Sequence, residues 1–247
     1  MVYYNTVNKL LKDSLLKLMK APEFSPFRLV GGTALSLQLG HRESIDIDLF
    51  SDIEYGTLNF KEIEDFLKSN FKYVDFLEIP SAIGKAYFIG ENRDNTIKLD
   101  VFYTDTYIQP YIEIDGIRMA SIEEIIAMKV DVIQRGGRKK DFWDLHCLLD
   151  TYNIIQMIAF HEQRYPYTHD KDLIVRNFTN FNLADDDFDP ICYKGKYWEF
   201  IKEDFEETIK NNFLTIFQYL IIFKTINKTK SPNRGFFYSS SAVCDLE

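Results

Sequence analysis

Residues 27–50 constrain the fold of this chain more than any other stretch. A short apolar run stops at Gly31 and Gly32, and a second apolar run follows, with helical spacing, up to Gly40. Glycine permits backbone angles and close approaches that a Cβ atom blocks. The stretch is therefore expected to form a strand, a glycine turn, a helix with Thr33 as its N-cap, a C-terminus at Gly40 and then a second strand.

The second of these strands carries two carboxylates. Aliphatic residues alternate there with Asp46 and Asp48, which is the period-two pattern of a strand. The two Asp side chains then lie on one face, about 7 Å apart. Residues 96–102 repeat the pattern, with Lys98 and Asp100 on the polar face. The aliphatic face of the first strand is expected to hold Ile45, Ile47 and Leu49.

If the two acidic strands are neighbours, three carboxylates converge. Unpaired anions at such range repel one another and raise one another's pKa values. Divalent cations remove the repulsion, and oxygen ligands on a rigid sheet suit Mg²⁺ or Mn²⁺. The candidate metal ligands are Asp46, Asp48 and Asp100.

The glycine turn supplies an anion site beside these carboxylates. Backbone N–H groups at a helix N-terminus, where the helix dipole is positive, bind phosphate. An NTP is thus expected between the turn and two metal ions, with Lys98 and Arg42 neutralising charge on the leaving pyrophosphate. The candidate phosphate-binding residues are Gly31, Gly32, Thr33, Arg42 and Ser44.

Composition narrows the class of protein. The 247 residues are 46% hydrophobic and 27% charged, with a net charge of −9, which suits a soluble globular chain without a global basic field. No apolar run approaches the ~18 residues of a membrane span, so no membrane partner is expected. The three cysteines lack metal-site spacing, which predicts reduced thiols in a cytoplasmic protein.

Strand patterns precede helical ones along the chain, which predicts an α+β fold. We expect a small mixed-sheet domain over 1–120, a mostly helical domain over 121–230 that completes the active-site cleft, and a tail over 231–247. Ser121 and Glu124 form a capping-box pattern at the start of the helical part. Further strands are expected at 74–79, 85–89, 111–114 and 117–119, and further helices at 60–70, 154–164, 173–181, 197–211 and 213–226.

The string over residues 30–50 resembles the signature of DNA polymerase β-like nucleotidyltransferases. Within that superfamily it is most similar to the AbiEii/AbiGii toxin family, and the resemblance covers about 27–149. It implies that Asp46 and Asp48 hold the metal ions. It also implies that Asp100 completes the metal site or takes the proton of the attacking hydroxyl.

A second family pattern matches Lys129, Arg135, Lys140-Asp141 and Asp144. The resemblance implies that such a lysine, here Lys129, contacts the triphosphate and that Asp141 or Asp144 supports the site. Without the resemblance, these charges are equally typical of a solvated helix face, and that alternative stays open.

These motifs predict a metal-dependent nucleotidyltransferase that moves an NMP from an NTP to an acceptor hydroxyl. By family analogy the acceptor is a tRNA 3′ end, with phosphate contacts from Arg135, Arg138, Lys139 and Lys140; a small molecule or a protein side chain stays open. A toxin role implies a cognate antitoxin. The alternatives are a non-catalytic nucleotide-binding module and a metal-dependent phosphodiesterase.

Overall fold

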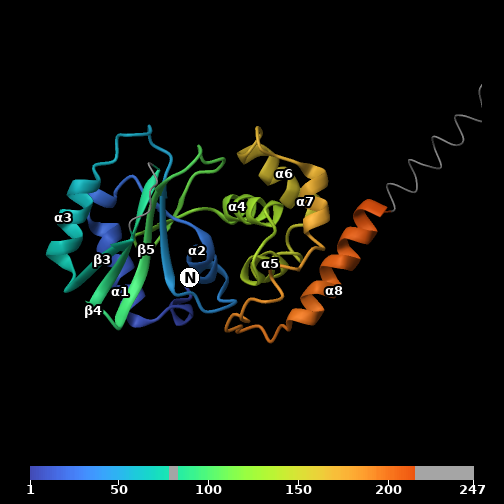
Figure 1. Cartoon of the computed structure of the whole chain (residues 1–247), viewed down its shortest axis with the longest axis horizontal. Coiled ribbons are helices and arrows are strands. Elements are labelled where there is room, and N and C mark those ends of the chain that lie inside the picture. The colour runs from blue at the N-terminus through green and yellow to red at the C-terminus, as the bar shows by residue number, and fades with distance from the viewer. Residues whose placement is uncertain (78–82, 215–247) are drawn as a thin grey trace, which may run out of the picture. The chain divides into compact units, whose positions relative to one another are not determined.

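The structure is a computed structural model that describes residues 1–77 and 83–214. Residues Met1–Ile209 form one compact unit, and Lys210–Glu247 belong to a second. The sheet and the helices α1–α8 lie in the first unit (Figure 1). The second unit contributes the π-helical segment Lys210–Leu214.

In the described residues, a seven-stranded mixed sheet organises the first unit, in the order β3-β4-β5-β2-β1-β7-β6. The pairs β2–β5 and β1–β7 are parallel, and the other neighbours are antiparallel. The strands are β1 (Arg28–Leu29), β2 (Asp46–Ser51), β3 (Tyr73–Leu77), β4 (Gly84–Asn92), β5 (Asn95–Tyr103), β6 (Ile112–Ile114) and β7 (Ile117–Met119). The expected α+β class is confirmed.

The described residues contain eight α-helices besides the sheet. Figure 1 shows α1 and α3 beside β3–β5 at one end of the unit, with α4–α8 gathered at the other end. They are α1 (Lys9–Lys20), α2 (Gly31–Leu39), α3 (Phe60–Asn70), α4 (Ile122–Gln134), α5 (Lys139–His146), α6 (Ile154–Arg164), α7 (Lys171–Asn177) and α8 (Trp198–Ile209). In the part of the chain that the structure describes, none of them has the length and apolar character needed to cross a bilayer.

Most expected elements form with small boundary shifts. The helices at 60–70 and 154–164 have the predicted bounds, whereas the helix expected at 173–181 runs from Lys171 to Asn177. The helix expected at 213–226, apart from its first two residues, and the end of the strand expected at 74–79 lie outside the described residues. The helical part begins at α4, directly after β7, but the division into two domains near residue 120 stays a prediction.

The two acidic strands are adjacent, as predicted. The aliphatic face of each strand is buried in the core. Because one face must be buried, the pairing register of the two strands is strongly specified. The parallel register places Asp48 opposite Asp100 and Asp46 opposite Lys98. The expectation for Ile45 is wrong: β2 begins only at Asp46, and the Ile45 side chain is 61% exposed.

The capping box expected at α4 forms only in half. The Ser121 hydroxyl accepts the Glu124 N–H, as predicted. The Glu124 carboxylate instead accepts the N–H groups of Ile108 and Gln109 and forms a buried ion pair with Arg164. Glu124 therefore ties the segment after β5 to α4 and α6.

An aromatic cluster anchors α5, the helix that carries Asp141 and Asp144. Trp143 and Trp198 are buried and stacked, as expected for core residues. The ring of Phe142 packs edge-on against those of Phe181, Trp198 and Phe205. Such packing holds the charged face of α5 in one position.

Candidate active site

Helix α2 begins at Gly31, three residues before the predicted position. Gly31 has φ +67°, and a Cβ there would lie 2.6 Å from the Asp48 Oδ2 atom. A Cβ on Gly32 would collide with the Arg42 guanidinium. No side chain caps the helix, so its first N–H groups have no capping acceptor and are suited to an anion.

Thr33 is not the N-cap that the sequence predicts, because the helix has already begun. Its buried hydroxyl donates to the backbone oxygen of Asp46. Since that proton is used, the Ser44 hydroxyl donates to Thr33 Oγ1, at 2.7 Å. Both residues therefore fasten α2 to the start of β2.

The three predicted carboxylates share one face of the sheet. The pKa of Asp48 is raised to about 6, first by burial and then by the negative charges of Asp100 and Asp46. Lys98 Nζ lies 2.5 Å from Asp100 Oδ2. The other oxygen, Asp100 Oδ1, is buried and has no hydrogen-bond partner among the described residues. The cluster is short of positive charge.

The donor set fits a hard divalent cation. No three His, Cys, Asp or Glu side chains in residues 1–77 and 83–214 already enclose a metal position. Mg²⁺, however, binds through one or two carboxylates and completes its shell with water and substrate phosphate. Asp46, Asp48 and the unpaired Asp100 Oδ1 supply oxygen donors of that kind beside the uncapped helix.

A buried ionic network faces the carboxylates from α4 and α5. Asp144 accepts hydrogen bonds from Arg42 Nε at 2.6 Å and Nη2 at 2.8 Å, and its Oδ1 lies 2.7 Å from His41 Nε2. Lys129 Nζ lies 2.8 Å from Asp144 and 2.5 Å from Asp141. Burial alone would raise the pKa of Asp144, but Arg42 and Lys129 outweigh it and hold the pKa well below its ordinary value.

Two residues expected to contact phosphate, Arg42 and Lys129, are paired with carboxylates in this network. Arg42 donates to both Asp144 oxygens and to the Glu43 carbonyl. Lys129 is matched by two carboxylates. Both side chains still line the cavity described next, so their contact with substrate stays a prediction. His41, which was not among the predicted site residues, is buried and joins the network.

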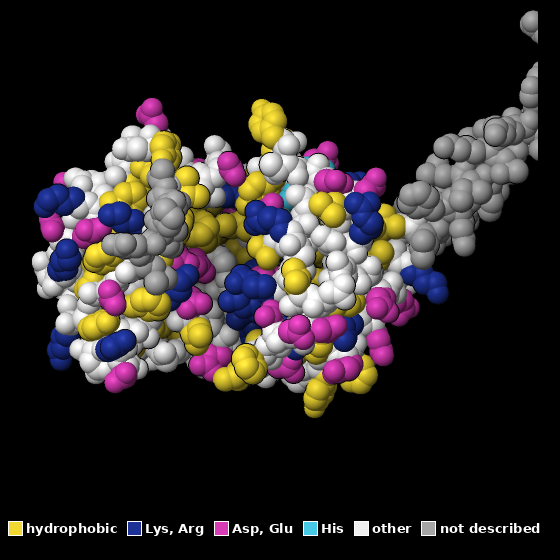
Figure 2. Space-filling model, in the orientation of Figure 1, with side chains coloured by type: hydrophobic (Ala, Val, Ile, Leu, Met, Phe, Trp, Pro, Cys, Tyr) yellow, Lys and Arg dark blue, Asp and Glu magenta, His cyan; other side chains and the backbone are white. Residues whose placement is uncertain are grey.

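A cavity of about 310 Å³ lies between the carboxylates and the network. Figure 2 shows Lys and Arg side chains facing Asp and Glu side chains across this part of the molecule. Four of the predicted site residues lie outside its lining: Thr33, Lys98, Asp100 and Asp144. The predicted residues that line it are Gly31, Gly32, Arg42, Ser44, Asp46, Asp48, Lys129 and Asp141.

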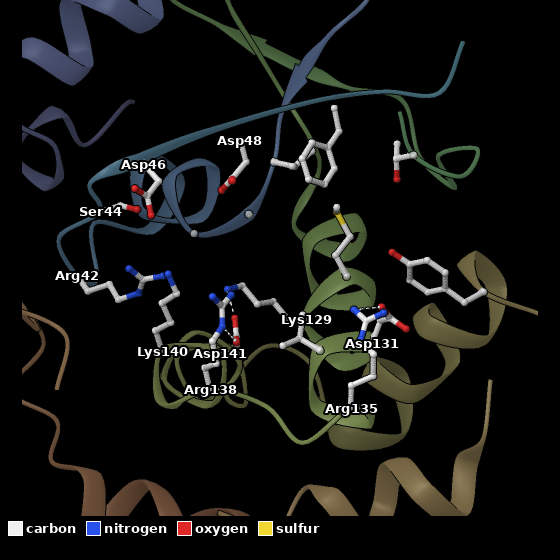
Figure 3. Close-up of a pocket in the computed structure, with 18 residues that line it drawn as sticks. Arg42, Ser44, Asp46, Asp48, Lys129, Asp131, Arg135, Arg138, Lys140 and Asp141 are labelled. Carbon is white, nitrogen blue, oxygen red and sulfur yellow. Dashed lines mark hydrogen bonds and ion pairs between the residues drawn. The ribbon is translucent and has the colours of Figure 1, made fainter. Parts of the chain in front are cut away.

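Lys140 lines the cavity but was predicted only as a contact to RNA phosphate, not as a catalytic or NTP-binding residue. It rises from α5 beside Arg42 and toward Asp46 (Figure 3). It is half-buried, and among the described residues it forms no ion pair. Burial lowers its pKa, and Arg138 and Lys129 lower it further. The family pattern contained Lys140, but only the structure distinguishes it from the ion-paired Lys129.

The fold of this chain is that of known nucleotidyltransferase structures. A Helicobacter pylori protein described as a candidate nucleotidyltransferase aligns with a TM-score of 0.52 at 21% identity, covering 91% of this chain and 96% of that chain. JHP933 from Helicobacter pylori aligns with a TM-score of 0.52 at 19% identity, covering 91% and 97%.

The family follows from the sequence match. The family model described as nucleotidyl transferase AbiEii toxin, type IV toxin–antitoxin system, matches residues 13–219, and the chain belongs to this family. An uncharacterised Aquifex aeolicus protein is 27% identical over 214 residues, which are 81% of this chain and 94% of that protein. The predicted resemblance is confirmed, and the chain is a nucleotidyltransferase toxin.

The crowded carboxylates predict that Asp48→Asn stabilises the metal-free protein. Because the folded pKa of Asp48 is raised to about 6, the folded state retains a proton that the unfolded state releases. Stability is therefore lost as pH rises from about 4 to 6, by about 1–3 kcal/mol. In EDTA at pH 7.5, urea denaturation should show Asp48→Asn more stable by about that amount. At pH 4 the difference in stability between Asp48→Asn and wild type should vanish. The control Asp94→Asn, in an exposed turn, should have wild-type stability at both pH values. If Asp48→Asn is no more stable than wild type at pH 7.5, the carboxylates do not repel one another as proposed.

Proposed function

We propose that this toxin transfers an NMP from an NTP to the 3′-hydroxyl of a tRNA in a metal-dependent reaction. One observation carries the proposal: the β2–β5 register brings Asp46, Asp48 and Asp100 together beside the uncapped N-terminus of α2. A cluster of crowded carboxylates and a helix N-terminus without a side-chain cap among the described residues are complementary to a metal–triphosphate complex.

Asp46 and Asp48 are the proposed ligands of Mg²⁺ or Mn²⁺. Bound there, the ion supplies positive charge for the attacking and leaving oxygens of an in-line displacement. Asp100 takes the third position, as a ligand through Oδ1 or as the acceptor of the hydroxyl proton. Lys98 holds the other Asp100 oxygen and so limits how that carboxylate can turn.

The triphosphate is proposed to lie along the glycine turn, with Ser44 and Lys140 at its side. The acceptor oxygen forms a bond to the α-phosphorus as the bond from that phosphorus to the bridging oxygen breaks. Pyrophosphate leaves with the electron pair, and its developing charge faces the N–H groups at Gly31 and Gly32 and the Lys140 ammonium.

The ionic network has a positioning role in this proposal. Asp144 is fully buried and outside the cavity lining, so it acts through Arg42 and Lys129 rather than on substrate. Because these contacts join the loop before β2 to α4 and α5, they fix Lys140 relative to Asp46.

The proposal includes a partner and a location. A cognate antitoxin is the proposed partner, which the type IV toxin–antitoxin family supports, and the cytoplasm is the proposed location, because NTPs and tRNA are found there. Arg135 and Arg138 are exposed and line the cavity, where they can meet RNA phosphates.

The test is label transfer from each of the four α-³²P-labelled NTPs to deacylated bulk tRNA, with Mg²⁺ or Mn²⁺. We expect label at the RNA 3′ end, one pyrophosphate released per transfer, and no reaction in EDTA. Mass spectrometry of the RNA then identifies the added base. Cleaved RNA without label would favour the phosphodiesterase alternative, and NTP binding without turnover the non-catalytic one.

A further inference from the structure

A second cavity of about 250 Å³ adjoins the candidate active site. It shares one wall with the first cavity, formed by Arg42, Ser44, Asp46 and Lys140. Its other wall comes from two distant segments of the chain: Ile45 precedes β2, and Phe188, Pro190 and Ile191 precede α8. A ligand in this cavity would therefore lie next to Asp46.

Backbone pairing holds the outer wall in place. The Glu43 N–H donates to the Ile191 carbonyl at 2.9 Å, and the Tyr193 N–H donates to the His41 carbonyl at 2.8 Å. These bonds flank an antiparallel bridge between Arg42 and Cys192. The segment is thus attached to the same loop that carries the Arg42–Asp144 pair.

Charged contacts fix the segment from α5 as well. The Lys139 N–H donates to Asp187 at 3.0 Å, and its ammonium lies 3.0 Å from Asp189. Lys139 was expected to contact RNA phosphate, but it is buried and paired with this loop. The wall is consequently part of the folded unit.

The outer wall presents apolar surface to solvent. Phe188 is 98% exposed, Ile191 62% and Ile45 61%, although each lines the cavity. Contiguous exposed apolar side chains rimmed by polar groups mark binding surfaces. Flat aromatic and aliphatic faces are the surfaces on which nucleic-acid bases stack without regard to sequence.

The wall shared by the two cavities carries a positive charge that can bind a nucleotide phosphate. Lys140 forms no ion pair within the described residues, and it faces both cavities. The segment before α8 is acidic, with Asp185, Asp187 and Asp189. These negative charges disfavour binding of several consecutive RNA phosphates near Lys140. A volume of about 250 Å³ lies below the ~300–1,000 Å³ of sites for drug-sized ligands, and suits one nucleotide.

We propose that this second cavity binds the 3′-terminal nucleotide of the RNA acceptor. Its base lies against Phe188 and Ile191, its phosphate meets Lys140, and its 3′-hydroxyl points to Asp46. The inference rests on the proposed nucleotidyl transfer and adds where the acceptor enters: between the start of β2 and the segment before α8.

The test compares Phe188→Ala and Ile191→Ala with a matched control, Tyr167→Ala. All three remove an exposed apolar side chain, and Tyr167 is 99% exposed and lines neither cavity. With deacylated bulk tRNA as the probe, we expect Phe188→Ala to raise the KM for tRNA about tenfold, as loss of one stacking contact does. The KM for NTP should stay within about twofold, as expected for a site that touches only the acceptor.

The outcomes separate this inference from the function it rests on. If wild-type protein transfers nucleotide to tRNA but neither variant changes the KM for tRNA, the acceptor site is wrong and the function stands. Label found on a protein side chain instead of RNA overturns both the acceptor site and the proposed tRNA acceptor. If wild-type protein transfers no nucleotide to any acceptor, the proposed function itself fails.

Discussion

Asp46→Ala, and separately Asp48→Ala, should lower the rate of nucleotide transfer about 10³-fold or more while leaving the protein folded. The activity is lost because these oxygens are the proposed cation ligands on β2. The fold is retained because the carboxylates repel one another in the absence of cations, so removing one relieves strain. Burial and the neighbouring charges already raise the pKa of Asp48 to about 6.

Measurement of initial rates with label transfer, together with urea denaturation of each variant, checks both halves of this prediction. Asp94→Ala, in the turn between β4 and β5, is the control and should retain full activity. Transfer at more than about a tenth of the wild-type rate in Asp46→Ala and Asp48→Ala would rule out the assigned site, because such ligand losses cost several kcal/mol.

Asp144→Ala should be the most destabilising single substitution in the site, at about 3–5 kcal/mol. Asp144 is fully buried and matches the charges of Arg42 and Lys129, at 2.6 and 2.8 Å. Lys129 keeps Asp141 after the change, but Arg42 is left as a buried cation without a carboxylate. Uncompensated buried charge is costly, since water no longer solvates it.

A matched surface pair provides the control for this second prediction. Asp65 on α3 forms an ion pair with Lys61 at 3.0 Å, and both side chains are more than half exposed, so Asp65→Ala should cost less than about 1 kcal/mol. Urea denaturation of both variants measures the difference. Equal effects would show that the Asp144 network is no stronger than a surface pair. A double variant, Arg42→Met with Asp144→Leu, should recover stability because it removes both charges.

The features that the sequence predicts well are local ones. The alternation around Asp46 and Asp100 predicts strands because successive side chains point to opposite faces. The helix at 60–70 is found at its predicted bounds because Asn59 caps it through the Glu62 N–H. The prediction of Thr33 as N-cap is wrong because Gly31, at positive φ, lets the helix begin earlier. Helix propensities do not indicate this start.

The partner of each charged side chain is not a local property. Arg42 and Asp144 are 102 positions apart, and nothing near either residue predicts their contact. The same holds for Lys129 and Lys140, which both belong to one sequence pattern. Burial between α4 and α5 pairs the first with carboxylates and leaves the second facing the cavity. Exposure of Ile45 likewise depends on where β2 starts relative to the segment before α8.

The sequence by itself therefore determined the kind of chemistry: an Asp-x-Asp strand after a glycine turn, a second strand with Lys98 and Asp100, and a family signature. These are short-range patterns whose spacing alone carries the information. The tertiary structure decided which charged side chains face the cavity and which form ion pairs between helices. It also decided where a second cavity adjoins the first, through which we propose that the acceptor enters. Such choices depend on burial and on pairings between distant segments, and they exist only once the chain has folded.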